Sequence, residues 1–129
     1  MIGIVIAAHG HLAEELAKTA QQIVGELPRV ASISVEPNVS LDELREHIKG
    51  AVGSVDDGEG VLVLADLLGG SPCNQSLMLC QKGKLEVLTG VNLPMLLKAN
   101  SLRLAKLPLR ELAESLAQYG QRNITLASV

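Results

Sequence analysis

Short apolar runs alternate with amphipathic stretches from one end of the chain to the other. This alternation is typical of β-strands and α-helices that alternate around a mainly parallel sheet. The apolar runs predict strands over residues 2–7, 30–35, 60–65, 85–88 and 124–127. Apolar residues at helical spacing predict helices over residues 12–24, from residue 41 to the turn at 56–58, from 71 to about 81, and over 93–99 and 109–119.

Several predicted helix boundaries carry residues that commonly cap helices. Ser40 is followed three residues later by Glu43, which is the spacing of a capping box. Ser71 and Pro72 predict an N-cap followed by proline at the first helical position, and Gly120 is expected to end the last helix. Together these elements predict a flavodoxin-like α/β fold, a three-layer sandwich with a mainly parallel five-stranded sheet and helices on both faces.

Length and composition predict one domain over residues 1–129. The chain has 129 residues, of which 47% are hydrophobic, and this is enough for one well-packed core. The apolar N-terminal run lacks a basic leader, and no run approaches a membrane span, which needs about 18 apolar residues. We therefore expect a cytoplasmic protein without membrane insertion, in which Cys73 and Cys80 are reduced and mostly buried.

Charge and aromatic content argue against nucleic acid as a partner. The formal net charge is -3, whereas a protein that neutralises a phosphate backbone needs a basic surface. Only 1% of the residues are aromatic, so stacking platforms for unpaired bases are not expected.

Polar residues that can carry chemistry follow three of the predicted strands. In an open α/β sheet, ligands bind beyond the carboxyl ends of the strands. His9 follows the first strand and Asp66 follows the third. If these strands are neighbours, about 4.8 Å apart, His9 can meet Asp66 directly. A carboxylate that accepts a hydrogen bond from one ring nitrogen leaves the other nitrogen as a nucleophile.

The loop after Asp66 has the composition of an anion site. Gly69 and Gly70 permit close backbone approach, and the hydroxyl of Ser71 can donate a hydrogen bond to a phosphoryl oxygen. A histidine nucleophile, a carboxylate that orients it and an anion site together indicate phosphoryl transfer through a phosphohistidine. This chemistry requires no metal ion and no cofactor.

Three blocks of the sequence resemble the signature blocks of mannose-family enzyme IIA domains of the phosphotransferase system. They are the His9-Gly10 pair, residues 66–74 (DLLGGSPCN) and residues 89–95 (TGVNLPM). The resemblance covers nearly the whole chain in order and spacing. Two positions depart from the family pattern, because Ala8 replaces a frequent Thr or Ser and Leu68 replaces a frequent aromatic residue.

The resemblance implies a role for the protein in the phosphoenolpyruvate-dependent transport of sugars. His9 would accept a phosphoryl group from phospho-HPr and pass it to an enzyme IIB on a separate chain, while Asp66 orients the ring and Ser71 helps to hold the phosphoryl group. Asn74 and Asn92 are expected to position these groups, although Asn92 could merely cap the helix that follows it. The resemblance also implies a homodimer, with the strand at residues 124–127 in the subunit contact.

Three other interpretations remain open from the residues alone. His9 and His11 alternate, so with Asp66 they could bind the metal ion of a hydrolase, although Gly10 is expected to turn the chain between them. A serine hydrolase that uses Ser71 is disfavoured because the following Pro72 has no N–H for an oxyanion hole. The same phosphohistidine could instead serve a regulatory switch without a sugar permease.

Overall fold

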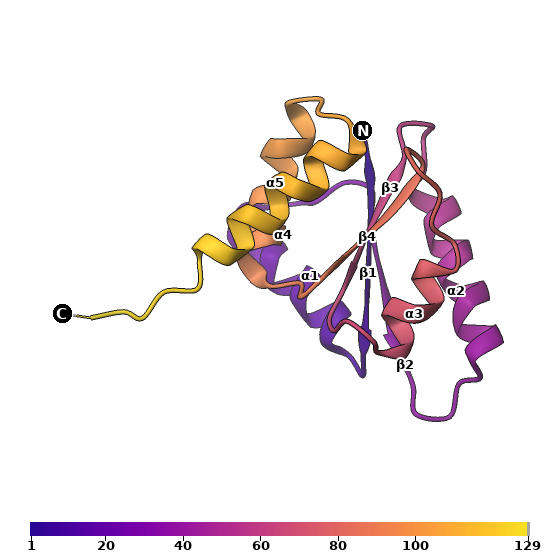
Figure 1. Cartoon of the computed structure of the whole chain (residues 1–129). Coiled ribbons are helices and arrows are strands. Elements are labelled where there is room, and N and C mark those ends of the chain that lie inside the picture. Colours follow the sequence, from indigo (N-terminus) through magenta and orange to yellow (C-terminus); the bar gives the residue numbers. More distant parts are fainter. Residues whose placement is uncertain (129) are drawn as a thin grey trace.

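The computed structural model describes residues 1–128 and contains one parallel sheet covered on both faces (Figure 1). The sheet has four strands in the order β2-β1-β3-β4, and each neighbouring pair is parallel. This order makes the first and third strands neighbours, as predicted. The strands are β1 (Gly3–His9), β2 (Val30–Val35), β3 (Val61–Ala65) and β4 (Leu85–Thr89).

Five helices form the two outer layers. Helices α1, α4 and α5 cover one face of the sheet, and α2 and α3 cover the other (Figure 1). No helix within residues 1–128 is long and apolar enough to cross a membrane. The helices are α1 (Leu12–Val24), α2 (Leu41–Val55), α3 (Ser71–Leu77), α4 (Leu93–Leu104) and α5 (Leu109–Arg122).

The two central strands are buried on both faces, which explains why their sequences are continuously apolar. Alternate side chains point to opposite layers. Ile4 and Leu62 pack with residues of α1, α4 and α5. Val5 and Val63 pack on the other face, with residues of α2. Both strands are therefore fixed from two sides, and His9 lies at the end of one of them.

The fifth strand expected at residues 124–127 is wrong. After α5 the chain leaves the body of the molecule, and the side chains of Ile124 and Leu126 are 79% and 93% exposed (Figure 1). The apolar residues alternate as in a strand, but no strand within residues 1–128 lies beside them to supply hydrogen bonds. A strand needs such a neighbour, because its backbone N–H and C=O groups pair between strands.

Helix α3 also differs from the prediction at both ends. Gly70 occupies the N-cap position that was expected for Ser71, and no side chain caps the helix. The helix ends at Leu77 because the following residues turn, and the N–H of Gln81 donates to the carbonyl of Leu85. Cys80 therefore lies beyond the helix and is exposed, whereas Cys73 is buried as expected and both thiols are free.

Helices α4 and α5 are longer than predicted. Gly120 does not end α5 but lies buried within it. A β-carbon at this position would lie 2.5 Å from Cε of Met95 on α4. Gly120 thus permits the close approach of the two helices, and the glycine that the sequence marks as a terminator is a packing residue.

Candidate active site at the carboxyl edge of the sheet

His9 and Asp66 meet at the carboxyl ends of the two central strands. His9 is the last residue of β1, and Asp66 directly follows β3. The His9 Nδ1 atom lies 2.8 Å from Oδ2 of Asp66, and the backbone N–H of His9 donates to the same oxygen at 3.0 Å. Two contacts therefore fix the carboxylate relative to both the ring and the backbone of the histidine.

This contact determines the tautomer of the imidazole. A carboxylate accepts hydrogen bonds, so Nδ1 carries the proton and Nε2 keeps its lone pair. The side chain of His9 is 49% exposed, whereas that of Asp66 is only 13% exposed. The imidazole therefore lies at the surface, and the carboxylate that contacts it is much less exposed.

Gly70 packs directly against the imidazole. A β-carbon at this position would lie 2.7 Å from Cε1 of His9 and 3.4 Å from Nε2. A real β-carbon does not fit at the first of these distances, so only glycine allows this contact without displacement of the ring. The close approach brings the loop backbone beside the nitrogen that is free to react.

The loop between β3 and α3 is held by its own hydrogen bonds. The side-chain amide of Asn74 donates to the carbonyl of Gly69 at 3.2 Å, and the N–H of Gly70 donates to the carbonyl of Leu67 at 3.3 Å. Gly69 has a φ of 88°, a left-handed conformation that glycine adopts without strain. Asn74 thus contacts the loop and not the imidazole itself.

A hollow of about 480 Å³ lies beside His9. Ser71 forms part of its wall, so the predicted phosphoryl-binding hydroxyl and the predicted nucleophile border the same space. The opposite wall comes from the connection between β2 and α2, including Glu36 and Leu41. This connection was not predicted from the sequence to lie at the site. The strand order, which puts the end of β2 next to β1, is the signal that would have found it.

Asn92 makes its contacts away from His9 and Asp66. Its Oδ1 atom accepts a hydrogen bond from the N–H of Met95, so it caps α4. Its Nδ2 atom donates to the carbonyl of Gly120 at 3.1 Å. Within residues 1–128 the side chain of Asn92 therefore caps α4 through one hydrogen bond, which is the role that the sequence left open, and links α4 to α5 through the other.

His11 is separated from the reacting pair. Gly10 has a φ of 59° and turns the chain, as expected. The side chain of His11 is 67% exposed, and its two ring nitrogens lie 3.9 Å from carboxylate oxygens of Glu14 and Glu36. No group of three or more His, Cys, Asp or Glu residues is arranged to hold a metal ion anywhere in residues 1–128.

Exposed leucines border the loop beside the imidazole. Leu67 and Leu68 are 57% and 72% exposed, on the segment that leads from Asp66 to the paired glycines. Leu41, on the far side of the hollow, is 56% exposed. His9 therefore lies in a partly apolar surface, which is suited to contact with another protein.

The EIIA-man family, described as "PTS system fructose IIA component", matches residues 3–117 of this chain. The chain belongs to this family. It is 41% identical over 98 residues to the "PTS system mannose-specific EIIAB component" of Escherichia coli (strain K12). That match covers 75% of this chain but only 30% of the relative, so the chain corresponds to a part of the longer protein.

Two solved structures of enzyme IIA components share the fold over nearly the whole length. The phosphotransferase system component EIIA from Streptococcus agalactiae has a TM-score of 0.88 and 30% identity, over 98% of this chain and 97% of its own. The mannose/sorbose-specific IIA subunit from Enterococcus faecalis has a TM-score of 0.87 and 32% identity, over 99% and 96%. Enzyme IIA components are in general phosphotransferases that work with HPr and an enzyme IIB.

Proposed function

We propose that residues 1–129 act as one enzyme IIA domain that carries a phosphoryl group on His9. The observation that carries this proposal is the 2.8 Å contact between His9 Nδ1 and Asp66 Oδ2, which leaves Nε2 as the nucleophile. The lone pair of Nε2 attacks the phosphorus of phospho-HPr and forms the new N–P bond. The N–P bond of the donor breaks, and its electron pair remains on the donor imidazole.

Asp66 contributes most after the new bond has formed. The phosphorylated ring keeps its proton on Nδ1 and carries a positive charge, which the adjacent carboxylate stabilises. The low exposure of Asp66 strengthens this effect, because fewer water molecules screen it. The reverse attack by a nucleophile of enzyme IIB, on a separate chain, then removes the phosphoryl group and restores the neutral imidazole.

The loop of Gly69, Gly70 and Ser71 is proposed to bind the phosphoryl oxygens. Gly70 lies against the ring, so the loop backbone is beside any group on Nε2. The hydroxyl of Ser71 borders the same hollow and does not cap α3, so it remains available as a donor. Asn74 supports the loop through its hydrogen bond to Gly69. We assign Asn92 no contact with the phosphoryl group.

The C-terminal segment is proposed to take part in a homodimer. Ile124 and Leu126 lie on alternate residues and are largely exposed. The strand β4 pairs only with β3 in the sheet, so its other side is an edge that a further strand can extend. Pairing of this segment with β4 of a second copy of the chain would cover both the exposed apolar residues and the open edge. It would also explain why the sequence has the pattern of a strand although the single chain forms none there.

Intact-protein mass spectrometry tests the carrier proposal. The protein is incubated with phosphoenolpyruvate, enzyme I and HPr under mildly basic conditions, and one phosphoryl adduct that is lost in acid is expected. His9→Ala should show no adduct, whereas the neighbouring His11→Ala should be modified as the native chain is. The addition of enzyme IIB should then discharge the adduct.

Two results would contradict the proposal. One is an adduct on His9→Ala equal to that on the native chain, which would move the phosphoryl group to another residue. The other is the absence of an adduct when the same HPr phosphorylates a known enzyme IIA. Retention of the folded state in His9→Ala is checked by circular dichroism.

A further inference from the structure

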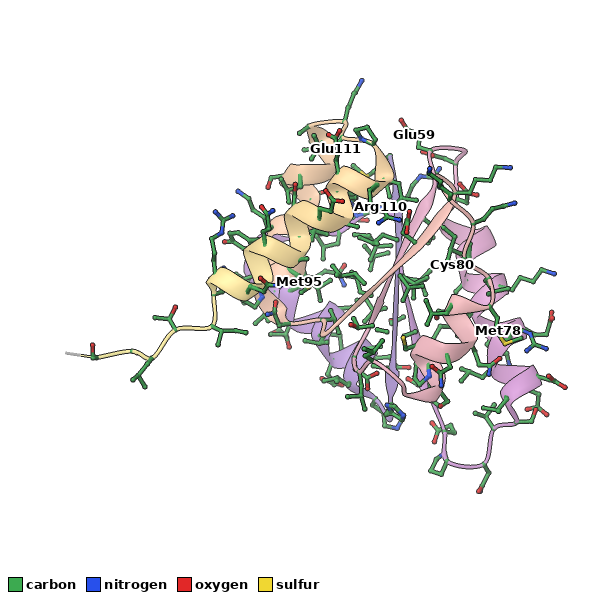
Figure 2. All side chains as sticks on the ribbon, in the orientation of Figure 1. Glu59, Met78, Cys80, Met95, Arg110 and Glu111 are labelled. Carbon is green, nitrogen blue, oxygen red and sulfur yellow. The ribbon has the colours of Figure 1, made fainter. Side chains whose placement is uncertain are left out.

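A second hollow lies at the opposite end of the sheet from His9. Its volume is about 360 Å³, at the lower end of the range of about 300–1,000 Å³ that is usual for small-molecule sites. It lies between the start of β1 and the loop that joins α4 to α5, which share one end of the molecule in Figure 1. Figure 2 shows Glu59 at this end, together with Arg110 and Glu111 at the start of α5.

Arg103 is a buried cation in the wall of this hollow. The residue is only 4% exposed. Its Nη1 atom donates to the carbonyl oxygens of Ile2 and Arg29, at 3.1 Å and 3.4 Å, and its Nη2 atom donates to Oδ1 of Asn100 at 3.4 Å. Its Nε atom has no hydrogen-bond partner within residues 1–128. All these acceptors are neutral, so within residues 1–128 no carboxylate balances the charge.

The lack of a counter-ion has a measurable consequence for the side chain. Burial lowers the pKa of Arg103 to about 10, because the charged form loses contact with water. A buried charge that lacks an opposite charge is unfavourable, and an anion placed nearby relieves it. The site is therefore more favourable for an anion than its exposed surface alone indicates.

The remaining charges around the hollow favour the same sign of ligand. Lys106 also lines it, and Glu59 is the one acidic residue among those that form the wall. The carboxylate of Glu59 is already bound to the amino group of Met1.

The rest of the wall is apolar. Leu104 contributes from the end of α4, and Leu107 and Pro108 contribute from the loop between α4 and α5. Leu104 is 64% exposed, which is high for a large aliphatic side chain in a hollow. A ligand with an aliphatic body would remove this surface from water.

We propose that this hollow binds a small carboxylate with a short aliphatic body, in a site separate from the phosphoryl chemistry. The carboxylate would lie toward Arg103 and Lys106, and the aliphatic part would contact Leu104 and Leu107. A planar carboxylate matches the geometry of a guanidinium group. Inorganic phosphate is also an anion, but it has no apolar part and would leave the leucine surface in contact with water.

Titration of the ¹⁵N-labelled full chain, followed by NMR at constant ionic strength, tests the proposal. Sodium 3-methylbutanoate is the probe, and saturable shifts are expected for backbone amides around the hollow. The neutral analogue 3-methylbutanamide should bind about tenfold more weakly, because it lacks the charge. Inorganic phosphate should also bind more weakly than the carboxylate.

The variants separate a specific site from general attraction to positive charge. Lys106→Gln should lower the affinity for the carboxylate about threefold to fivefold, as expected for the loss of one exposed charge. Lys98→Gln removes the same charge from α4 at a residue outside the hollow, so it should bind as the native chain does. Arg103→Met should abolish binding of the carboxylate, provided that circular dichroism shows that the variant folds. If it does not fold, the affinity of Lys106→Gln still tests the proposal.

Four results would overturn the proposal: no saturable shifts with the carboxylate, equal binding of the amide, equal or tighter binding of phosphate, or an unchanged affinity in Lys106→Gln. The chain with His9→Ala should bind the probe normally. The anion site can therefore fail or succeed independently of the phosphoryl carrier proposed above.

Discussion

At the scale of single residues, Asp66 fixes both the orientation and the tautomer of His9. Asp66→Asn keeps the shape of the side chain but allows an N–H₂ group to face Nδ1, which would leave the proton on the wrong nitrogen. We expect phosphoryl transfer to slow by about 10²-fold or more, with little change in stability. Rapid-quench measurement of transfer from phospho-HPr checks this, with Glu46→Gln on the exposed face of α2 as the control. Equal rates for the native chain and Asp66→Asn would remove Asp66 from the mechanism.

Gly70 is a second determinant at this scale. The substitution Gly70→Ala would place a β-carbon 2.7 Å from Cε1 of His9, so the ring must move away from its present position. We expect about tenfold or greater loss of transfer rate, because small displacements of reacting groups are costly. Gly50→Ala has open space around the new carbon and is the matched control. A normal rate in Gly70→Ala would show that the ring tolerates displacement.

The contact between His9 and Asp66 could be predicted from the sequence because each residue follows a buried strand, and the carboxyl ends of neighbouring parallel strands lie side by side. The partners of Asn92 could not. An Asn before a helix caps it in any context, and only the folded chain shows that its other hydrogen bond goes to Gly120, 28 residues later. The hollow beside His9 was missed for a similar reason, since its far wall comes from a connection that carries a single carboxylate, Glu36, and no glycine-rich motif.

At the scale of secondary-structure elements, the packing of α4 on α5 depends on Gly120. Gly120→Ala should lower the free energy of unfolding by about 1–3 kcal/mol, because the new carbon would lie 2.5 Å from Met95 Cε in a filled interface. Gly53→Ala, in open space on α2, should instead raise it by up to about 1 kcal/mol through helix propensity. Urea denaturation of both variants measures the difference. Equal stabilities would show that Met95 can move without loss.

Gly120 also shows how accurately local sequence rules locate the ends of helices and strands. The amphipathic pattern located α1, β2 and the start of α5 at their observed positions, because their apolar residues face the core. Helix ends were less accurate, since a glycine at the end of a pattern is compatible with either a stop or a close contact. The prediction of a strand at residues 124–127 was wrong for another reason. An alternating pattern indicates that a segment can pair with a strand, but not whether that strand belongs to the same chain.

At the scale of the whole molecule, the C-terminal segment should control assembly and not chemistry. Removal of residues 124–129 is expected to convert a dimer to a monomer in light scattering after gel filtration. Phosphorylation of His9 should persist, since His9 and Asp66 both lie in one chain. Thr125→Ala changes the segment without loss of its large apolar residues and should remain dimeric. A truncated chain that stays dimeric would place the subunit contact elsewhere.

His9 lies at the end of β1 and Asp66 directly follows β3, and these positions determine which motions can disturb their contact. Each of these strands has a neighbour on both sides, whereas β2 and β4 are edges. In hydrogen exchange, amides of central strands commonly open only with global unfolding, and edges and loops open at lower free energy. The slowest amides should therefore lie where β1 and β3 pair, in the register that runs from Gly3–Val61 to Ala7–Ala65. His9 ends β1 and Asp66 directly follows β3, so their contact rests on the part of the sheet that opens last, while the edges and loops around it remain free to adapt.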